Sequence, residues 1–192
     1  MPRATDAKSR LIATAIRLFR RRGYNGVGLT ELLEVSGAPK GSFYHHFPAG
    51  KEALAVDAVT QAGAGIAALI EDCFATATSM DEGAERLARV IADGFAASDY
   101  TAGCPVTGVL LDTVPQSEPL TRAGREVFDG WRAVLDRHAR RLGDTRDIDA
   151  MGEALLVAIE GGWILARITR SRTPILLAGR AFAMVGRSPH TP

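Results

Sequence analysis

Residues 25–54 have the sequence NGVGLTELLEVSGAPKGSFYHHFPAGKEAL, and this stretch decides the fold. Apolar residues recur at helical spacing over about 29–36, with Gly28 before them as an acceptable N-cap and Gly37 after them as a turn residue. A second short helix begins at once, with Pro39 at its first position, where the missing N–H of proline costs nothing. The sequence therefore predicts two short helices joined by a tight glycine turn.

The second of these helices is predicted to divide into a buried face and an outer face. Phe43 and Phe47 are four residues apart, so they share one side and are assigned to the core. Two helices joined by a glycine turn form the helix-turn-helix arrangement, which places its second helix in the major groove of duplex DNA. The candidate DNA contacts are Thr30, Pro39, Lys40, Gly41, Ser42, Tyr44, His45 and Lys51.

The side chains of these residues have the chemistry that DNA contacts need. Lys40 can reach a phosphate or a guanine edge, and Ser42 is short enough for a base edge. Thr30 and Lys51 stand at helix N-termini, which favour anions. Gly41 has two explanations, since glycine costs about 1 kcal/mol inside a helix. Either the backbone approaches a sugar-phosphate chain closely, or Gly41 packs against the first helix.

The charge distribution supports a polyanion-binding N-terminus. Residues 1–51 carry a formal charge of +6, whereas the whole chain carries +1, so the remaining residues carry −5. A basic head on an acidic body is typical of a nucleic-acid-binding module joined to one that does not bind polyanions. The alternative is a solvated cationic helix face, to which Arg20–Arg22 alone would be assigned because cations are favourable at a helix C-terminus.

The rest of the chain is also helical in pattern, which predicts an all-α protein. Helices are expected over about 5–22, 51–77, 81–98, 105–112, 118–142, 147–170 and 174–186, and no useful alternating strand pattern appears. We expect an N-terminal DNA-binding domain over 1–50 and a larger helical domain over 51–192. Because no apolar run reaches the roughly 18–20 residues needed to span a bilayer and no signal segment is evident, we expect a cytoplasmic protein without membrane contact, metal or cofactor.

Two motifs resemble a known family. The stretch AIRLFRRRGYNGVGLTELLEVSGAPKGSFYHHFPAGKEAL (15–54) closely resembles the DNA-binding domain of the TetR family of bacterial transcriptional repressors, and GCPVTGVLLDT (103–113) is similar to the regulatory domain of its LmrA/YxaF-like subgroup. Two departures stand out, because many members have Val-Ser in place of Ala38-Pro39 and a link one residue shorter than Pro48-Ala49-Gly50.

The resemblance implies a homodimer and a small-molecule effector. It assigns the dimer contact to the two last helices, which are markedly apolar, although an intramolecular core would explain that composition too. Aromatic and aliphatic residues of the body are candidates for a ligand pocket that suits a hydrophobic or aromatic effector, with plain core packing as the alternative for each. These residues are Phe95, Cys104, Leu110, Phe128, Trp131 and Trp163.

The function that the resemblance implies is a ligand-responsive repressor that binds operator DNA as a homodimer and is released by its effector. Two other classes stay open. A small helical enzyme is disfavoured because its carboxylates are scattered and His138, among arginines, is expected to be solvated. A protein-binding adaptor without DNA binding leaves the basic N-terminus unexplained.

Overall fold

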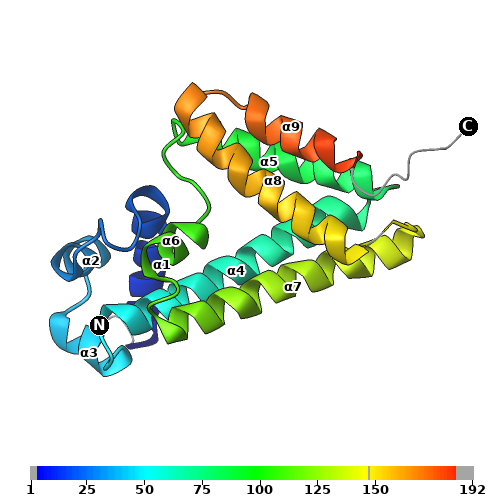
Figure 1. The fold of residues 1–192 in the computed structure, drawn as a ribbon. Helices are drawn as coiled ribbons and strands as arrows, with labels where there is room; N and C mark the ends of the chain where they lie inside the picture. The colour runs from blue at the N-terminus through cyan, green and yellow to red at the C-terminus, as the bar shows by residue number, and fades with distance from the viewer. Residues whose placement is uncertain (1–3, 147, 185–192) are drawn as a thin grey trace, which may run out of the picture. The chain divides into compact units, whose positions relative to one another are not determined.

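The computed structural model describes residues 4–146 and 148–184, and all of the regular secondary structure in these ranges is helical (Figure 1). The all-α prediction is confirmed. The helices are α1 (Ala4–Arg22), α2 (Leu29–Ser36), α3 (Lys40–His46), α4 (Lys51–Ala75), α5 (Met80–Ala97), α6 (Thr107–Thr113), α7 (Glu118–Leu142), α8 (Ile148–Thr169) and α9 (Thr173–Phe182).

Several helix boundaries differ from the prediction, most by one or two residues, and among them are the start of α3 and the end of α9. Pro39 is the N-cap of α3 rather than its first helical residue, with φ −60° and ψ 142°. The pyrrolidine ring fixes φ near this value in the extended conformation as well as in the helix, so the sequence pattern could not separate the two positions. Helix α9 ends at Phe182, and the predicted extension to residue 186 lies partly outside the described residues.

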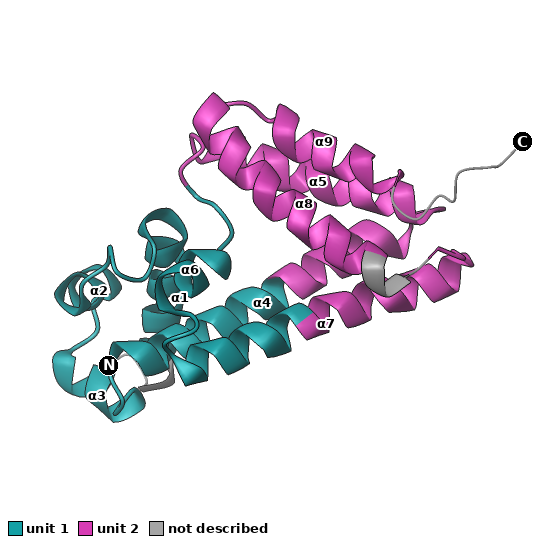
Figure 2. Ribbon diagram, viewed as in Figure 1, with its two compact units in different colours: residues 1–65, 102–128 teal, residues 66–101, 129–192 magenta. Residues whose placement is uncertain are grey.

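The chain forms two compact units, shown in teal and magenta in Figure 2. The first unit contains residues 1–65 and 102–128, and the second contains residues 66–101 and 129–192. The first unit extends beyond the predicted boundary after residue 50, because α1 packs against α6 as well as against α2 and α3. The two compact units do not coincide with the predicted domains 1–50 and 51–192. The boundary between a DNA-binding and a regulatory domain thus stays a prediction.

The core of the first unit is aromatic and aliphatic. Phe19, Phe43 and Leu32 are completely buried, and Phe47 is nearly so. The rings of Phe43 and Phe47 lie 5.6 Å apart, as their four-residue spacing predicts. The apolar side of α3 is therefore held against its neighbours, and its opposite side is left to solvent.

In the second unit α9 packs against both α5 and α8. Glycine permits both approaches, because a Cβ at Gly179 would lie 2.6 Å from the Cβ of Ala88, and one at Gly162 would lie 3.1 Å from the Cα of Ile175. Gly162 thus permits a close approach of α8 and α9 within the chain. Gly161 is exposed and has open space around it.

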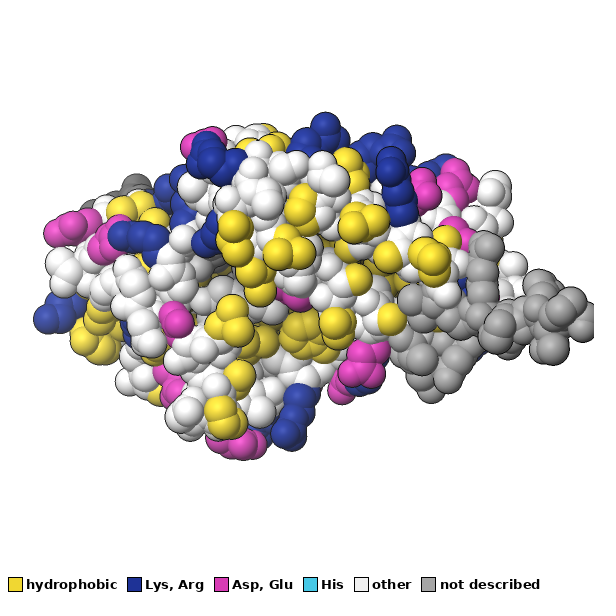
Figure 3. Space-filling model, turned by 45° about the horizontal axis from the view of Figure 1, so that its top comes forward, with side chains coloured by type: hydrophobic (Ala, Val, Ile, Leu, Met, Phe, Trp, Pro, Cys, Tyr) yellow, Lys and Arg dark blue, Asp and Glu magenta, His cyan; other side chains and the backbone are white. Residues whose placement is uncertain are grey.

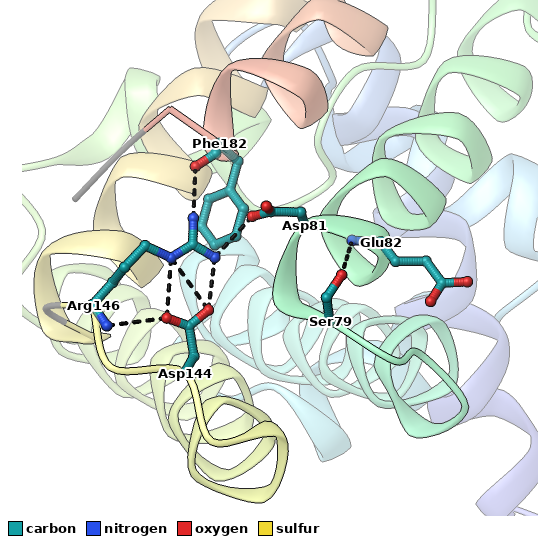
Figure 4. Close-up of polar contacts among 6 residues, drawn as sticks. All are labelled: Ser79, Asp81, Glu82, Asp144, Arg146 and Phe182. Atoms are coloured by element: carbon teal, nitrogen blue, oxygen red, sulfur yellow. Dashed lines mark hydrogen bonds and ion pairs between the residues drawn. The ribbon is translucent and has the colours of Figure 1, made fainter. Parts of the chain in front are cut away.

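A charged cluster around Arg146, in the loop after α7, contacts the start of α5 and the end of α9 (Figure 4). The Arg146 guanidinium donates to Asp144 Oδ2 at 2.7 Å and to Asp81 Oδ1 at 2.8 Å, and it lies 5.3 Å from the ring of Phe182. Arg146 thereby links the first turn of α5 with the last residue of α9. These hydrogen bonds hold the pKa of the Asp144 carboxyl below its usual value.

We expect Arg146→Ala to lower the free energy of unfolding by about 1–3 kcal/mol, because two partly buried carboxylates lose a charged donor. The pKa of Asp144 is depressed in the folded state, so its contribution is present above the ordinary value of 3.8 and is lost as the pH falls below it. Urea unfolding of both proteins between pH 7 and pH 3 measures this. The difference should shrink at the acid end, and a constant difference would contradict the assignment.

His138 is buried rather than solvated, so that expectation was wrong. Only 3% of it is exposed, and its ring centroid lies 5.8 Å from that of Phe74. Its Nδ1 accepts a hydrogen bond from Arg141 Nε at 3.3 Å, and its Nε2 lies 3.1 Å from Glu71 Oε1. Arginine neighbours suggested a solvated face, but Arg141 turns inward to the carbonyl of Phe74 and covers the histidine.

Helix α4 corrects the expectation that no segment is apolar enough to cross a membrane. By length and composition alone it qualifies, with a mean hydropathy of 1.6 over its most apolar window, and it is the one such helix in the described part of the chain. The core helices of soluble proteins meet the same criteria of length and composition, and 39% of this apolar part of α4 is buried inside the protein. Leu54, Val59 and Ile70 are among the buried residues, which is the pattern of a packed helix.

Candidate nucleic-acid interface

The turn between α2 and α3 has the geometry that its glycine predicts. Gly37 adopts the left-handed conformation, with φ 62°, and its N–H donates to the carbonyl of Glu34. Ser36 is buried, and its hydroxyl accepts a hydrogen bond from the N–H of Ala38 at 3.3 Å. The side chain of Ser36 thus closes the turn, a role that the sequence pattern did not reveal.

The outer side of α3 presents most of the candidate DNA contacts to solvent. Lys40, Gly41, Tyr44 and His45 are exposed, and Ser42 is partly exposed. Tyr44 keeps 46% of its surface exposed although its ring meets Phe43 edge-on at 5.1 Å. Packing against Phe43 therefore orients the Tyr44 ring while leaving it accessible. Pro39, just before this helix, is exposed as well.

Gly41 is not required for packing. A Cβ added there would meet nothing within 4 Å, whereas one at Gly83 would lie 2.3 Å from the ring of Phe74. Its conformation is that of an ordinary helix rather than a left-handed turn. The explanation that Gly41 packs against the first helix is therefore wrong, and close approach of a molecule outside the chain stays as the prediction.

The two candidates at helix N-termini differ in their surroundings. Thr30 is exposed at the second position of α2. The ammonium of Lys51 donates to the carbonyl of Tyr24 at 2.7 Å and lies 3.9 Å from the centroid of that ring. Burial lowers the pKa of Lys51, and the nearby Asp112 carboxylate partly offsets this. Lys51 therefore supports the turn after α1, and a phosphate contact by its remaining donors stays a prediction.

Sequence reasoning missed the contacts that hold the end of α1. Asp112 Oδ2 of α6 accepts a hydrogen bond from the Asn25 N–H at 2.8 Å, and Arg20 Nε donates to the carbonyl of Gly103 at 2.6 Å. In the sequence Asp112 is one of several scattered carboxylates. The conformation of the turn before α2 thus depends on residues about 80 positions away, and no local pattern signals such a pairing.

The candidate pocket residues fall in both compact units. Phe95, Trp131 and Trp163 belong to the second unit, whereas Cys104, Leu110 and Phe128 belong to the first. All are buried except Phe128, which is partly exposed. Their burial agrees with a pocket wall and with core packing alike, so the assignment stays a prediction.

Large apolar side chains are exposed on the two last helices. We name this surface the α8–α9 apolar face, and Figure 3 shows hydrophobic side chains gathered on it. On α8 the exposed residues follow helical spacing, and Ile168 keeps 74% of its surface exposed. An apolar surface of this kind indicates a binding partner. The face consists of Val157, Ile164, Leu165 and Ile168 on α8, Leu177 on α9, and Met184 in the turn directly after α9.

Two family models match the chain, in agreement with this geometry. Residues 11–58 match the model described as bacterial regulatory proteins of the tetR family. Residues 81–181 match the model described as the C-terminal domain of LmrA/YxaF-like transcriptional regulators. The first match covers α2 and α3 with the turn between them, and the second covers α5 to α8 and most of α9.

Similar proteins extend the match over almost the whole chain. The HTH-type transcriptional regulator LmrA of Bacillus subtilis is 34% identical over 172 residues, which are 89% of this chain and 92% of LmrA. Reduced Escherichia coli NemR has the same fold, with a TM-score of 0.82, 23% identity and coverage of 96% and 99% of the two chains. A cysteine mutant of CifR, solved with 26-base-pair operator DNA, has a TM-score of 0.79 at 23% identity, with coverage of 96% and 99%. This chain therefore belongs to the TetR family of transcriptional regulators, with an LmrA/YxaF-like C-terminal domain, and it is a DNA-binding regulator rather than an enzyme.

Proposed function

We propose that this regulator is a cytoplasmic repressor that binds its operator as a homodimer through α3 and leaves DNA when a small hydrophobic or aromatic effector binds. The observation that carries the DNA-contact assignment is the outer side of α3, where polar side chains surround an exposed glycine with free space above it. Phosphate contacts position such a helix and short side chains contact base edges. The proposed contacts remain Thr30, Pro39, Lys40, Gly41, Ser42, Tyr44, His45 and Lys51.

Dimerisation is supported by the α8–α9 apolar face. The buried side of α8 already serves the core of its own unit, with Leu155 fully buried, while Ile164 and Ile168 on the other side have no cover within the described chain. One helix thus provides both the intramolecular core and a separate apolar surface. A two-fold dimer covers the same patch on both copies, and it fixes the distance between the two recognition helices.

Release by an effector is supported by the contacts at the end of α1. Segment 102–113 holds the turn before α2 through Asp112 and Gly103, so a change in this segment displaces the start of the helix-turn-helix. An effector shifts the population off DNA only if it binds the displaced conformation more tightly. By thermodynamic linkage, DNA then weakens the binding of the effector by the same factor as the effector weakens the binding of DNA.

The test of the proposed function is an electrophoretic mobility shift with DNA from upstream of the regulator's own gene. We expect one discrete complex of a dimer with duplex DNA at low salt, and reduced transcription from that promoter when the protein is added. The absence of a complex with any upstream fragment, together with a stable complex with another protein, would instead support the adaptor alternative.

Salt dependence separates charged from neutral phosphate contacts. Lys40→Ala is expected to weaken binding to all sequences and to flatten the plot of log affinity against log salt by about 0.9 per contact, because one cation no longer displaces a counterion. Tyr44→Phe removes a neutral donor, so affinity should fall at every salt concentration with an unchanged slope. Fluorescence anisotropy across 50–300 mM salt measures both. An unchanged slope for Lys40→Ala would remove Lys40 from the phosphate contacts.

A further inference from the structure

The indole N–H of Trp163 is a buried donor without an acceptor. Trp163 lies on α8 with only 8% of its surface exposed, and Nε1 has no hydrogen-bond partner among the described residues. Buried tryptophan N–H groups are normally paired, because an unpaired polar group loses its bond to water on folding. Each exception therefore needs an explanation, and a bound molecule that supplies the acceptor is one.

The buried side of α8, on which Trp163 lies, is otherwise apolar. Leu155, Ile159 and Ala166 share the buried side of α8 with Trp163, and none of these side chains can accept a hydrogen bond. One turn beyond Trp163, the guanidinium of Arg167 lies 5.8 Å from the centroid of the buried Phe95 ring and donates to the carbonyl of Thr101 at 3.0 Å. Trp163 thus shares α8 with aliphatic side chains and, one turn away, with a cation that lies against an aromatic ring.

This combination selects a class of ligand. Apolar walls favour a hydrophobic body, the indole N–H requires an acceptor atom, and Arg167 disfavours a cation. We infer that the Trp163 N–H is the hydrogen-bond donor of the effector site and that the site takes a neutral, largely apolar molecule carrying an acceptor oxygen such as a carbonyl. The inference rests on the proposed effector function and adds to it the polar group that the effector must have.

Two tricyclic compounds of nearly equal size test the inference, because 9-fluorenone has a carbonyl oxygen and fluorene has none. Equilibrium dialysis with the full-length protein should show that fluorenone binds about five- to tenfold more tightly than fluorene, as one neutral hydrogen bond provides. In Trp163→Phe the two affinities should become equal. Phe182→Leu, a change at a buried aromatic residue of this unit that is not a candidate pocket residue, should keep the difference. Equal affinities in the wild type, or no binding of either compound, would overturn the inference.

A second measurement does not depend on any ligand. Replacing Trp163 by β-(3-benzothienyl)alanine keeps the shape of the side chain and removes only the N–H. We expect an unchanged or higher melting temperature, since no hydrogen bond within the chain is lost. A clear decrease would show that the N–H has a partner in the free protein and would overturn the inference. Operator binding without added compound, measured on the same samples, tests the proposed function separately.

Discussion

Ile164→Glu is expected to convert the protein from a dimer to a monomer and to weaken operator binding by more than about a hundredfold. Ile164 is 61% exposed on the α8–α9 apolar face. In a two-fold interface the substitution occurs twice, and each carboxylate would lose water without gaining a partner, at a cost of several kcal/mol. A single recognition helix then loses the advantage of simultaneous binding to two half-sites. Analytical ultracentrifugation and a mobility-shift titration measure the two effects.

The matched control for this prediction is Val90→Glu on α5. Val90 is another exposed apolar residue of the second unit, at 47%, but it lies outside the α8–α9 apolar face. This variant should stay dimeric and bind the operator like the wild type. Circular dichroism and thermal unfolding check that both variants are folded. A folded Ile164→Glu dimer with normal operator affinity would disprove the assignment of this face.

Gly41→Ala is expected to make the protein more stable and yet to weaken operator binding. Alanine stabilises a helix interior by about 0.5–1 kcal/mol relative to glycine, and no atom lies within 4 Å to clash with the new methyl group. If the backbone of α3 closely approaches DNA, the same methyl group displaces the helix. A cost of about 1.4 kcal/mol at each half-site amounts to a hundredfold for the dimer.

Gly94→Ala on α5 is the control for the glycine effect. Gly94 is also a helical, exposed glycine with free space around its Cα, but it lies far along the chain from the helix-turn-helix. Chemical unfolding should show a similar gain in stability for both variants, and the operator titration should show a loss for Gly41→Ala alone. Normal operator affinity of Gly41→Ala would mean that no DNA surface lies close to this residue.

The sequence predicted the boundaries and the buried side of those helices that have strong local signals. Helix α2 was predicted over the residues at which it begins and ends, because Gly28 and Gly37 delimit a short apolar repeat. The boundaries of α7 were also predicted correctly, and the four-residue spacing of Phe43 and Phe47 identified the buried side of α3. These features depend on neighbours within one or two turns, which a single sequence contains.

The exposed side of α3 was predictable for the same reason, whereas the surroundings of the candidate DNA contacts were not, and the contacts themselves stay predictions. His45 lies opposite Phe43 and Phe47, so helical periodicity alone places it outside. Lys40 is exposed as the first residue of the helix, although it lies one turn before Phe43 on the same side. The contact between Lys51 and Tyr24 exists because the start of α4 lies next to the end of α1, and no local pattern in the sequence predicts this. Whether Gly41 packs or stays open also depended on neighbours from other helices.

By itself the sequence determined the family, the helical class and the side of α3 that faces outward, because these depend on local motifs and periodicity. Only the tertiary structure decided that His138 is buried beneath Arg141, that Asp112 holds the turn before α2, and that the N–H of Trp163 has no partner among the described residues. Each of these features joins residues that are not local neighbours, or depends on which atoms surround a buried group. Burial and hydrogen bonding are properties of the packed chain, so no local pattern encodes them.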